Sequence, residues 1–390
     1  MKLLGTLLAV PLAALAAPIL EARGEAIPGK WIAVLKPESA AENMLSTMTD
    51  ILGGTLPQHT YKIGNFQGYS ISASDAAINS IADLAEVAYI EPDSKVSIAS
   101  LVTQDAAPWG LARISSRKPD TSEYRYDDSA GEDTYAYIID TGIFVDHPEF
   151  EKRAEFGANF VENSTNDTDE NGHGTHVAGT TGSKTYGVAK KTNLVAVKVL
   201  NADGAGTISQ FIAGLQWAVD DATHKDRKFS LDWSHPAVAN ISLGALRTVS
   251  SAINAAAAAA VKAGLFLSVA AGNDDLDASL FSPASEPTVC TVGATRKDDS
   301  RAPFSNWGSL IDVFAPGVDI ISTWNNGSTG IISGTSMAAP HITGLGAYLL
   351  ALEGPRDPIA LCDRIQKLAT PDIVTDPLSD NNILAYNGQA

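Results

Sequence analysis

Short apolar runs rich in strand-forming residues alternate with longer segments through the second half of the chain. The runs fall at 135–139, 194–199, 237–243, 265–269 and 288–292. An alanine run between Ser251 and Gly264 predicts a helix with a cap and a stop. Strands that alternate with helices in this way predict a parallel sheet covered by helices, so we expect an α/β domain here.

The first residues have the features of a targeting segment. Residues 1–17 combine a basic start, a short apolar core and small residues at the end, which is typical of a secretory signal peptide. The core is too short to span a bilayer comfortably. A second apolar run at 342–352 follows Pro340 and ends at Glu353, so we interpret it as a buried helix. These features predict a secreted, extracellular protein.

Residues 18–99 have a pattern of their own. Strand patterns at 30–35, 68–71 and 87–90 are interrupted by helix patterns at 42–52 and 76–84. This βαββαβ-like order predicts a small α+β domain of the ferredoxin-like type.

A serine with small neighbours begins the apolar helical run near the C-terminus. Ser336 lies in the segment GTSMAAP at 334–340. A helix start offers unpaired N–H groups and a positive dipole end, which suit a nucleophile whose reaction develops an oxyanion. Serine is also a common helix N-cap, and that interpretation needs no chemistry.

Two upstream segments supply the partners that such a serine needs. Asp140 ends the apolar run at 135–139, where open parallel sheets carry functional groups. His176 lies in NGHGTHVAG at 171–179 and is our candidate base, with Asp140 holding its tautomer. We expect His173 to shape the loop rather than react. Taken singly, Asp140 could be a turn residue and the two histidines a metal pair, although that pair lacks a third ligand.

Three motifs in this order resemble a known family. DTG at 140–142, HGTH at 173–176 and GTSMA at 334–338 resemble the signatures of subtilisin-like serine proteases. APWGL at 107–111 and LAYNG at 384–388 are similar to the proteinase K branch, closest to fungal alkaline proteases called oryzins. The resemblance implies a three-layer parallel-sheet catalytic domain at 100–390, preceded by an inhibitory and folding-assisting propeptide at 18–99. It also implies self-cleavage near Ala99–Ser100.

The resemblance assigns further roles at the site. Asn273 matches the side chain that donates to the oxyanion, although an asparagine after glycine is also a common turn former. Substrate-binding positions are implied at Gly204, Ile208, Ser242, Leu243, Gly244, Ala270, Gly272 and Phe281. For Ile208 and Phe281, ordinary core packing is an equal alternative. An apolar, poorly selective pocket is the expected result.

Structural features are also implied by the resemblance. Cys290 and Cys362 match a disulfide of proteinase K, the alternative being two buried free thiols. Asp312 matches a calcium ligand, with the backbone carbonyls of Pro287 and Val289 completing the site. Glycosylation sequons fall at Asn163, Asn166 and Asn326, whereas a further sequon at Asn240 lies in a predicted strand and is not expected to be used.

The formal net charge of −18 disfavours nucleic-acid and anionic-membrane partners and favours cations. The family resemblance implies a monomeric, broad-specificity serine endopeptidase, with protein and peptide substrates, no cofactor for the chemistry and structural calcium. Two other classes stay open from the sequence: a binding protein on an inactive protease scaffold and a metal-dependent hydrolase.

Overall fold

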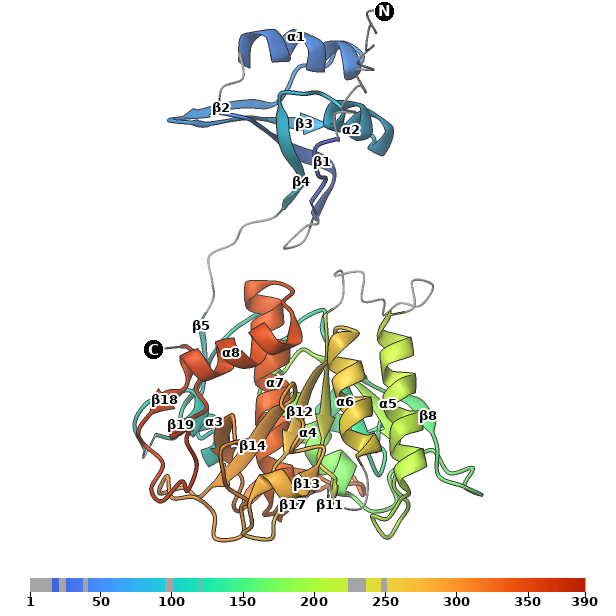
Figure 1. Ribbon diagram of the computed structural model, residues 1–390, viewed down its shortest axis with the longest axis vertical. Coiled ribbons are helices and arrows are strands. Elements are labelled where there is room, and N and C mark those ends of the chain that lie inside the picture. Colours follow the sequence, from blue (N-terminus) through green and yellow to red (C-terminus); the bar gives the residue numbers. More distant parts are fainter. Residues whose placement is uncertain are drawn as a thin grey trace, which may run out of the picture. The chain divides into compact units, whose positions relative to one another are not determined.

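The computed structural model describes residues 16–20, 26–37, 41–94, 101–119, 121–223, 236–246 and 251–389 (Figure 1). The chain divides into a smaller unit, which ends at Ile98, and a larger unit, which begins at Ala99. Most of the expected signal segment and the expected cleavage point at Ala99–Ser100 lie outside the described residues.

The smaller unit has the βαββαβ order that the sequence predicted. Its elements are β1 (Ala26–Leu35), α1 (Ala41–Ile51), β2 (His59–Ile63), β3 (Phe66–Ser72), α2 (Asp75–Ala82) and β4 (Val87–Ser94). The strands form one sheet in the order β2-β3-β1-β4, with antiparallel neighbours throughout. Met48 of α1 and Ile78 of α2 are buried with Ile71 and Ile90 in one core, so both helices pack on the sheet.

The larger unit is built around a nine-stranded sheet in the order β18-β19-β15-β14-β12-β10-β7-β9-β8. Its strands are β7 (Tyr135–Asp140), β8 (Ala154–Asn159), β9 (Asn193–Lys198), β10 (Ala237–Ile241), β12 (Phe266–Ala270), β14 (Cys290–Thr295), β15 (Val313–Pro316), β18 (Thr370–Pro371) and β19 (Ile383–Leu384). The pairs are parallel except β18 with β19.

Helices lie on both faces of this sheet, and successive strand residues alternate between two cores. Ala136 and Ile138 of β7 belong to one core, whereas Tyr137 and Ile139 belong to the other. The first core is covered by α4 (His173–Gly182), α7 (Thr335–Glu353) and α8 (Pro358–Leu368), and the second by α5 (Ile208–Thr223) and α6 (Ala252–Lys262). The predicted three-layer α/β architecture is therefore confirmed.

Short elements complete the larger unit. They are β5 (Leu101–Gln104), α3 (Trp109–Ile114), β6 (Tyr124–Asp127), η1 (Pro148–Phe150), β11 (Ala245–Leu246), η2 (Ala278–Leu280), β13 (Phe281–Ser282), β16 (Ile320–Thr323) and β17 (Thr329–Ile332). The strand expected at 237–243 ends at Ile241, because residues 242–244 leave the sheet and line pockets instead.

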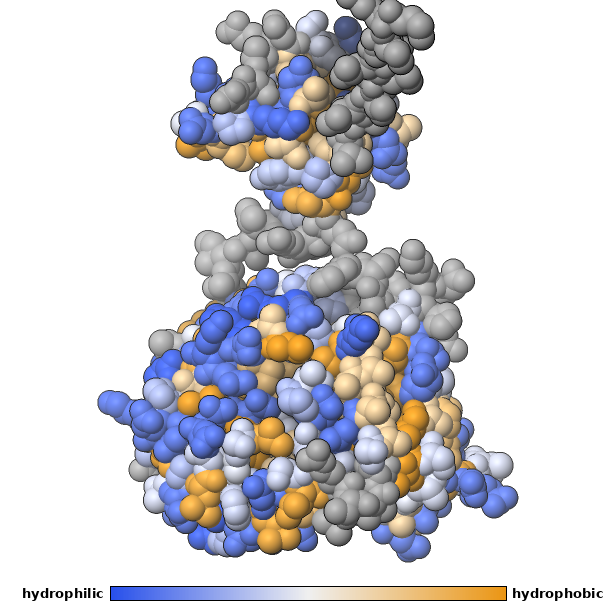
Figure 2. All heavy atoms as spheres, viewed as in Figure 1, coloured by the Kyte–Doolittle hydropathy of each residue, from blue (hydrophilic) through white to orange (hydrophobic). Residues whose placement is uncertain are grey.

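The visible surface differs in hydropathy between α6 and α8. In Figure 2 the visible face over α6 is pale orange to orange, and its exposed positions include Ala252, Ala255 and Ala259. The face over α8 is mostly hydrophilic. Within the described ranges, no helix combines the length and hydropathy needed to cross a bilayer.

Candidate active site

Asp140 and His173 form a direct pair at the carboxyl edge of the sheet. Asp140 is the last residue of β7, and its carboxylate is fully buried. Its Oδ1 accepts the Thr141 N–H and lies 2.8 Å from Nδ1 of His173, the first residue of α4. Burial acts to lower the pKa of His173, but the charge and hydrogen bond of Asp140, with a contribution from Asp169, hold the pKa above its ordinary value.

The expectation that His176 pairs with Asp140 is wrong. His176 lies one turn deeper in α4, is fully buried, and has its Nε2 2.9 Å from the Ile320 carbonyl oxygen. Its ring packs edge-on against Trp324, and burial lowers its pKa to about 4. A general base needs access to the substrate, so His173 in the first turn of α4 can act as a base, whereas the buried His176 cannot. The two rings have different partners, which also disfavours the alternative of a metal pair.

Ser336 is the second residue of α7 and is partly exposed. Its Oγ donates to the Ser242 carbonyl oxygen at 3.2 Å, and the Ser242 hydroxyl donates to the Ser336 carbonyl oxygen at 3.0 Å. These two bonds fasten the start of α7 to the segment that follows β10. The first N–H groups of a helix have no partner within the helix, so they are available to a developing negative charge.

Asn273 is held so that its amide nitrogen is left for other partners. Its Oδ1 accepts both the N–H of Thr335, at 2.8 Å, and the Thr335 hydroxyl, at 2.9 Å. A Cβ placed on Gly334 would lie 3.5 Å from Asn273 Nδ2 and 3.6 Å from the Ser336 nitrogen. The two donors therefore lie near one common point beside the start of α7, close enough together to act on a single oxyanion.

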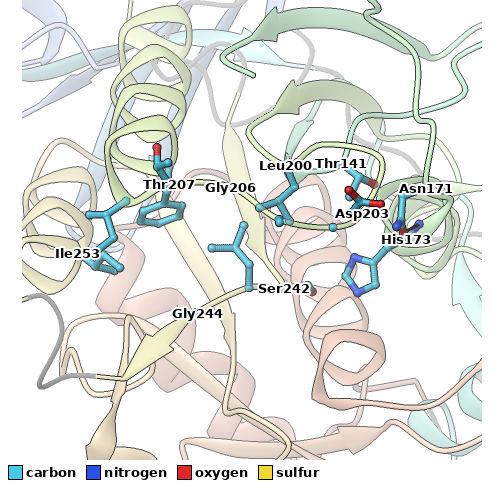
Figure 3. Close-up of a pocket in the computed structure, with 15 residues that line it drawn as sticks. Thr141, Asn171, His173, Leu200, Asp203, Gly206, Thr207, Ser242, Gly244 and Ile253 are labelled. Carbon is cyan, nitrogen blue, oxygen red and sulfur yellow. Dashed lines mark hydrogen bonds between the residues drawn. The ribbon is translucent and has the colours of Figure 1, made fainter. Parts of the chain in front are cut away.

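Two pockets meet at residues 242–244, and together they contain all eight expected substrate-binding positions. The first pocket has a volume of about 570 Å³ and is lined by Gly204, Ile208 and His173 among others. In Figure 3 it extends from His173 at one end to Ile253 at the other, with Ser242 and Gly244 along its edge.

The second pocket, of about 520 Å³, contains Ser336 and Asn273. The expected positions on its wall are Ala270, Gly272 and Phe281. Ser242, Leu243 and Gly244 line both pockets, so a bound chain could pass from the His173 side to the Ser336 side along one backbone segment.

The predicted disulfide is present. Cys290 at the start of β14 is bonded to Cys362 in α8, with the Cα atoms 5.7 Å apart. Among the described residues no free cysteine remains.

Asp312 lies beside this disulfide. Its Oδ2 accepts the Thr291 N–H at 2.8 Å, and burial raises the pKa of its carboxyl to about 7. The sulfurs of Cys290 and Cys362 lie within 4.8 Å of its carboxylate, but a disulfide cannot act as a thiolate ligand. Its Oδ1 accepts from Gln366 Nε2 at 3.4 Å, an uncharged donor, so this desolvated carboxyl is suited to a bound cation.

The sequons differ in accessibility. Asn163 and Asn166 are exposed in the loop between β8 and α4, and Asn326 is exposed between β16 and β17. Asn240 is fully buried in β10, where no glycan would fit.

An α/β fold that presents an aspartate–histidine pair and a serine at a helix start in two pockets sharing residues 242–244 has the arrangement expected of a serine hydrolase. A family model described as "Subtilase family" matches residues 131–361, and one described as "Peptidase inhibitor I9" matches residues 33–99. The chain therefore belongs to the subtilase family of serine proteases and carries an inhibitor I9 domain ahead of its protease domain.

Individual relatives agree with this assignment. The chain is 46% identical over 409 positions to a subtilisin-like protease of Coccidioides posadasii, covering 100% of this chain and 99% of that protein. It is 49% identical over 324 positions to a cuticle-degrading protease of Metarhizium anisopliae, covering 83% and 81%. A crystal structure of a cold-adapted subtilisin-like serine proteinase superposes with a TM-score of 0.68 at 41% identity, covering 73% of this chain and 99% of that one.

Sequence reasoning missed two features of the site. It paired the wrong histidine of HGTH with Asp140, although His173 follows a glycine and is the first helical residue, a position that lines a pocket. It also missed Asp169, whose carboxylate organises the loop before α4. The spacing of Asp169 four residues before His173 was visible, but one of its partners, Thr141, follows the distant strand β7.

Proposed function

We propose that Ser336 is the nucleophile, His173 the general base, Asp140 its orienting carboxylate and Asn273 an oxyanion donor. The observation that carries this proposal is the 2.8 Å contact of Asp140 Oδ1 with His173 Nδ1. A proton on Nδ1, donated to Asp140, leaves Nε2 with the free lone pair that a base needs.

The reaction then follows from these groups. The Ser336 hydroxyl, which donates to the Ser242 carbonyl in this structure, turns to donate to His173 Nε2. As Oγ bonds to the substrate carbonyl carbon, its proton moves to Nε2 and the carbonyl electrons move to oxygen, where Asn273 Nδ2 and the Ser336 N–H stabilise them. The C–N bond breaks as the leaving amine takes that proton. Water repeats the sequence with the acyl-enzyme and releases a carboxylic acid.

The pockets support a broad preference for peptides with apolar side chains. The second pocket is lined mainly by small and apolar residues, among them Ala270, Gly272 and Phe281, and its lining also includes the charged Asp274. Glycine at 244 and 272 leaves backbone groups open, so an extended peptide can pair with them as an added strand.

The chain organisation supports a secreted zymogen. The I9 domain precedes the protease domain, and we propose that it assists folding and inhibits the site until it is removed near Ala99–Ser100. The signal-like residues 1–17 support export, and the exposed Asn163, Asn166 and Asn326 support N-glycosylation.

Structural calcium is proposed at Asp312, with the carbonyl oxygens of Pro287 and Val289 as further ligands. These are hard oxygen ligands of the kind calcium prefers. The ion would offset the cost of burying the Asp312 carboxylate, and it takes no part in the chemistry above.

Processing tests the proposed function. Wild-type protein should appear with an N-terminus within a few residues of Ser100, whereas Ser336→Ala should accumulate as an uncleaved chain. N-terminal sequencing of both, combined with mapping of the bonds cut in a denatured protein substrate, measures self-cleavage and side-chain preference together. Correct cleavage of Ser336→Ala with no other protease present would overturn the self-processing claim.

A further inference from the structure

Asp169 is a buried carboxylate that the chemistry above does not use. It lies in the loop before α4, and its relative exposure is 3%. Its Oδ1 accepts from the Thr141 hydroxyl at 2.8 Å, the Asn171 N–H at 3.0 Å and the Gly172 N–H at 2.9 Å. Its Oδ2 accepts from the N–H and the hydroxyl of Thr175, at 2.9 and 2.6 Å. One side chain thus accepts five hydrogen bonds, which is near the capacity of a carboxylate.

These bonds reach both members of the catalytic pair. Gly172 immediately precedes His173, so the hydrogen bond from the Gly172 N–H to Asp169 fixes the backbone just before the proposed base. Thr141 immediately follows Asp140, and its hydroxyl donates to Asp169 while accepting the Gly174 N–H at 2.9 Å. The Gly174 N–H after His173 is therefore tied to Thr141 directly, and the Gly172 N–H before it is tied to Thr141 through Asp169.

The start of α4 needs such an external acceptor. Its N-cap is Gly172, which has no side chain to accept a hydrogen bond from the first turn. The Asp169 carboxylate takes that role from outside the helix, and a negative charge is favourable at a helix N-terminus.

A buried cation balances this cluster from the neighbouring strand. Lys198 of β9 is fully buried, and its ammonium donates to the Thr141 carbonyl at 2.7 Å and to the Leu200 carbonyl at 3.1 Å. Thr141 is therefore held through its hydroxyl by Asp169 and through its carbonyl by Lys198. A segment held at both polar groups has little freedom to move Asp140 away from His173.

We propose that Asp169, acting through Thr141, is a positioning residue that sets the distance and angle between Asp140 and His173. This inference rests on the proposed role of His173 as the base. Asp169 touches no reacting atom; it holds the two segments that carry the pair at one separation. Misplacement of about 1 Å in such a pair costs about 10²-fold in rate.

The charge of Asp169 also acts on the base. The titratable groups that interact with His173 are Asp140 of β7, Asp169 of the loop and His176 of α4. Other charges in this region are Lys198 of β9 with Glu170, 3.9 Å apart, and Asp203, which lines the same pocket as His173. Asp169 is one of the groups that raise the pKa of His173. Replacing Asp169 with a neutral residue therefore lowers the pKa of His173. The base then stays unprotonated to a lower pH, so the acid limb of the pH profile, where activity rises with pH, moves to lower pH.

Asp169→Asn tests the inference on the processed enzyme, with active sites counted by fluorophosphonate titration. We expect kcat to fall about 10- to 100-fold with KM unchanged, because pair geometry acts on the chemical step. We also expect the acid limb of kcat/KM to shift to lower pH. Asp167→Asn, the same change at an exposed position of the same loop, should leave both quantities unchanged.

Thr141 gives a second test that keeps the charge. Thr141→Val removes the hydroxyl that bridges Asp169 and Gly174, and Thr141→Ser keeps it. Thr141→Val should lower kcat about tenfold, and Thr141→Ser should keep kcat near the wild-type value, since serine retains the hydrogen-bonding hydroxyl. If Asp169→Asn does not fold, the comparison of Thr141→Val with Thr141→Ser still tests the positioning role.

Outcomes separate this inference from the proposed function. Wild-type protein that fails to react with the fluorophosphonate at Ser336 would refute the proposed function. An active wild type, with kcat and acid limb unchanged in folded Asp169→Asn, would refute the positioning role alone. Equal losses in Thr141→Val and Thr141→Ser would do the same, and so would a drop in kcat for Asp169→Asn without a shift of its acid limb.

Discussion

In the proposed mechanism two helix starts carry the reacting groups, and they are capped in different ways. Both α4 and α7 begin after a glycine, Gly172 or Gly334, that provides no side-chain cap. In α4 the missing acceptor is the charged carboxylate of Asp169. In α7 it is the neutral amide oxygen of Asn273, which accepts twice from Thr335.

The difference in charge follows from what each helix presents. His173 gains a proton during the reaction, so a negative cap nearby favours the state that must form. The Ser336 side develops a negative oxygen, so a carboxylate there would repel it. The Asn273 amide accepts hydrogen bonds from the start of α7 through its oxygen and keeps Nδ2 as a donor. The cap is therefore matched to the charge that appears in the transition state as well as to the helix.

The largest expected losses of kcat come from removing the reacting side chain at either helix start. His173→Ala or Ser336→Ala should lower kcat by about six powers of ten, the size found when a triad serine or histidine is removed from subtilisin, a member of this family. His176→Gln keeps a donor for the Ile320 carbonyl and should lower thermal stability while changing kcat less than about tenfold. Steady-state kinetics of protein processed in trans by immobilised wild-type enzyme measures all three. A folded His176→Gln as inactive as His173→Ala would show the two turns of α4 to be equivalent.

The cap of α7 is tested by removing the neutral amide of Asn273 or replacing it with a charged carboxylate. Asn273→Ala should lower kcat by about 10²–10³, the loss found for the corresponding donor in subtilisin. Asn273→Asp keeps an oxygen for Thr335 but places a carboxylate where Nδ2 was, so its kcat should fall at least as far while its melting temperature stays closer to wild type. Kinetics and calorimetry on both variants separate capping from oxyanion stabilisation. A kcat for Asn273→Asp well above that of Asn273→Ala would contradict the donor role.

The fold and the site could be predicted from the sequence to different extents. The strands β7, β9, β10, β12 and β14 and the order of the smaller unit follow from local apolar periodicity, which depends on each segment alone. The choice between His173 and His176 depends on which turn of α4 faces the end of β7, a tertiary fact that the HGTH spacing does not contain. The substrate positions came from the family resemblance and line the pockets, whereas Asp169 needed the structure.

The two N-cap glycines should respond differently to alanine. Gly172 has φ +107°, and a Cβ there would lie 2.5 Å from the Trp324 indole. Gly172→Ala should therefore destabilise the protein by about 1–3 kcal/mol. Gly334 has extended backbone, and the atom nearest to its added Cβ is 3.5 Å away, so Gly334→Ala should scarcely alter stability. Thermal unfolding of both compares them, and an equal loss in the two variants would show that backbone conformation does not distinguish the helix starts.

The smallest effect on catalysis is expected away from both helix starts, at Asp312. Added calcium should slow thermal inactivation without changing kcat, and Asp312→Ala should remove the protection. Since the folded pKa of Asp312, about 7, exceeds its unfolded value, the stability that this group contributes without calcium is lost as pH rises through about 7. Calcium needs the ionised carboxylate, so its protection should grow over the same pH range. Inactivation rates with calcium and with chelator, at several pH values, measure this; equal protection in Asp312→Ala would place the ion elsewhere.

The pairing of Ser336 with His173 is tested most directly by fluorophosphonate labelling followed by peptide mass spectrometry. Wild type, His173→Ala and His176→Gln are compared after processing in trans. We expect label on Ser336 in wild type and in His176→Gln, and a labelling rate lowered by several powers of ten in His173→Ala. Rapid labelling of Ser336 in His173→Ala, with labelling lost in folded His176→Gln, would contradict the assignment of the base.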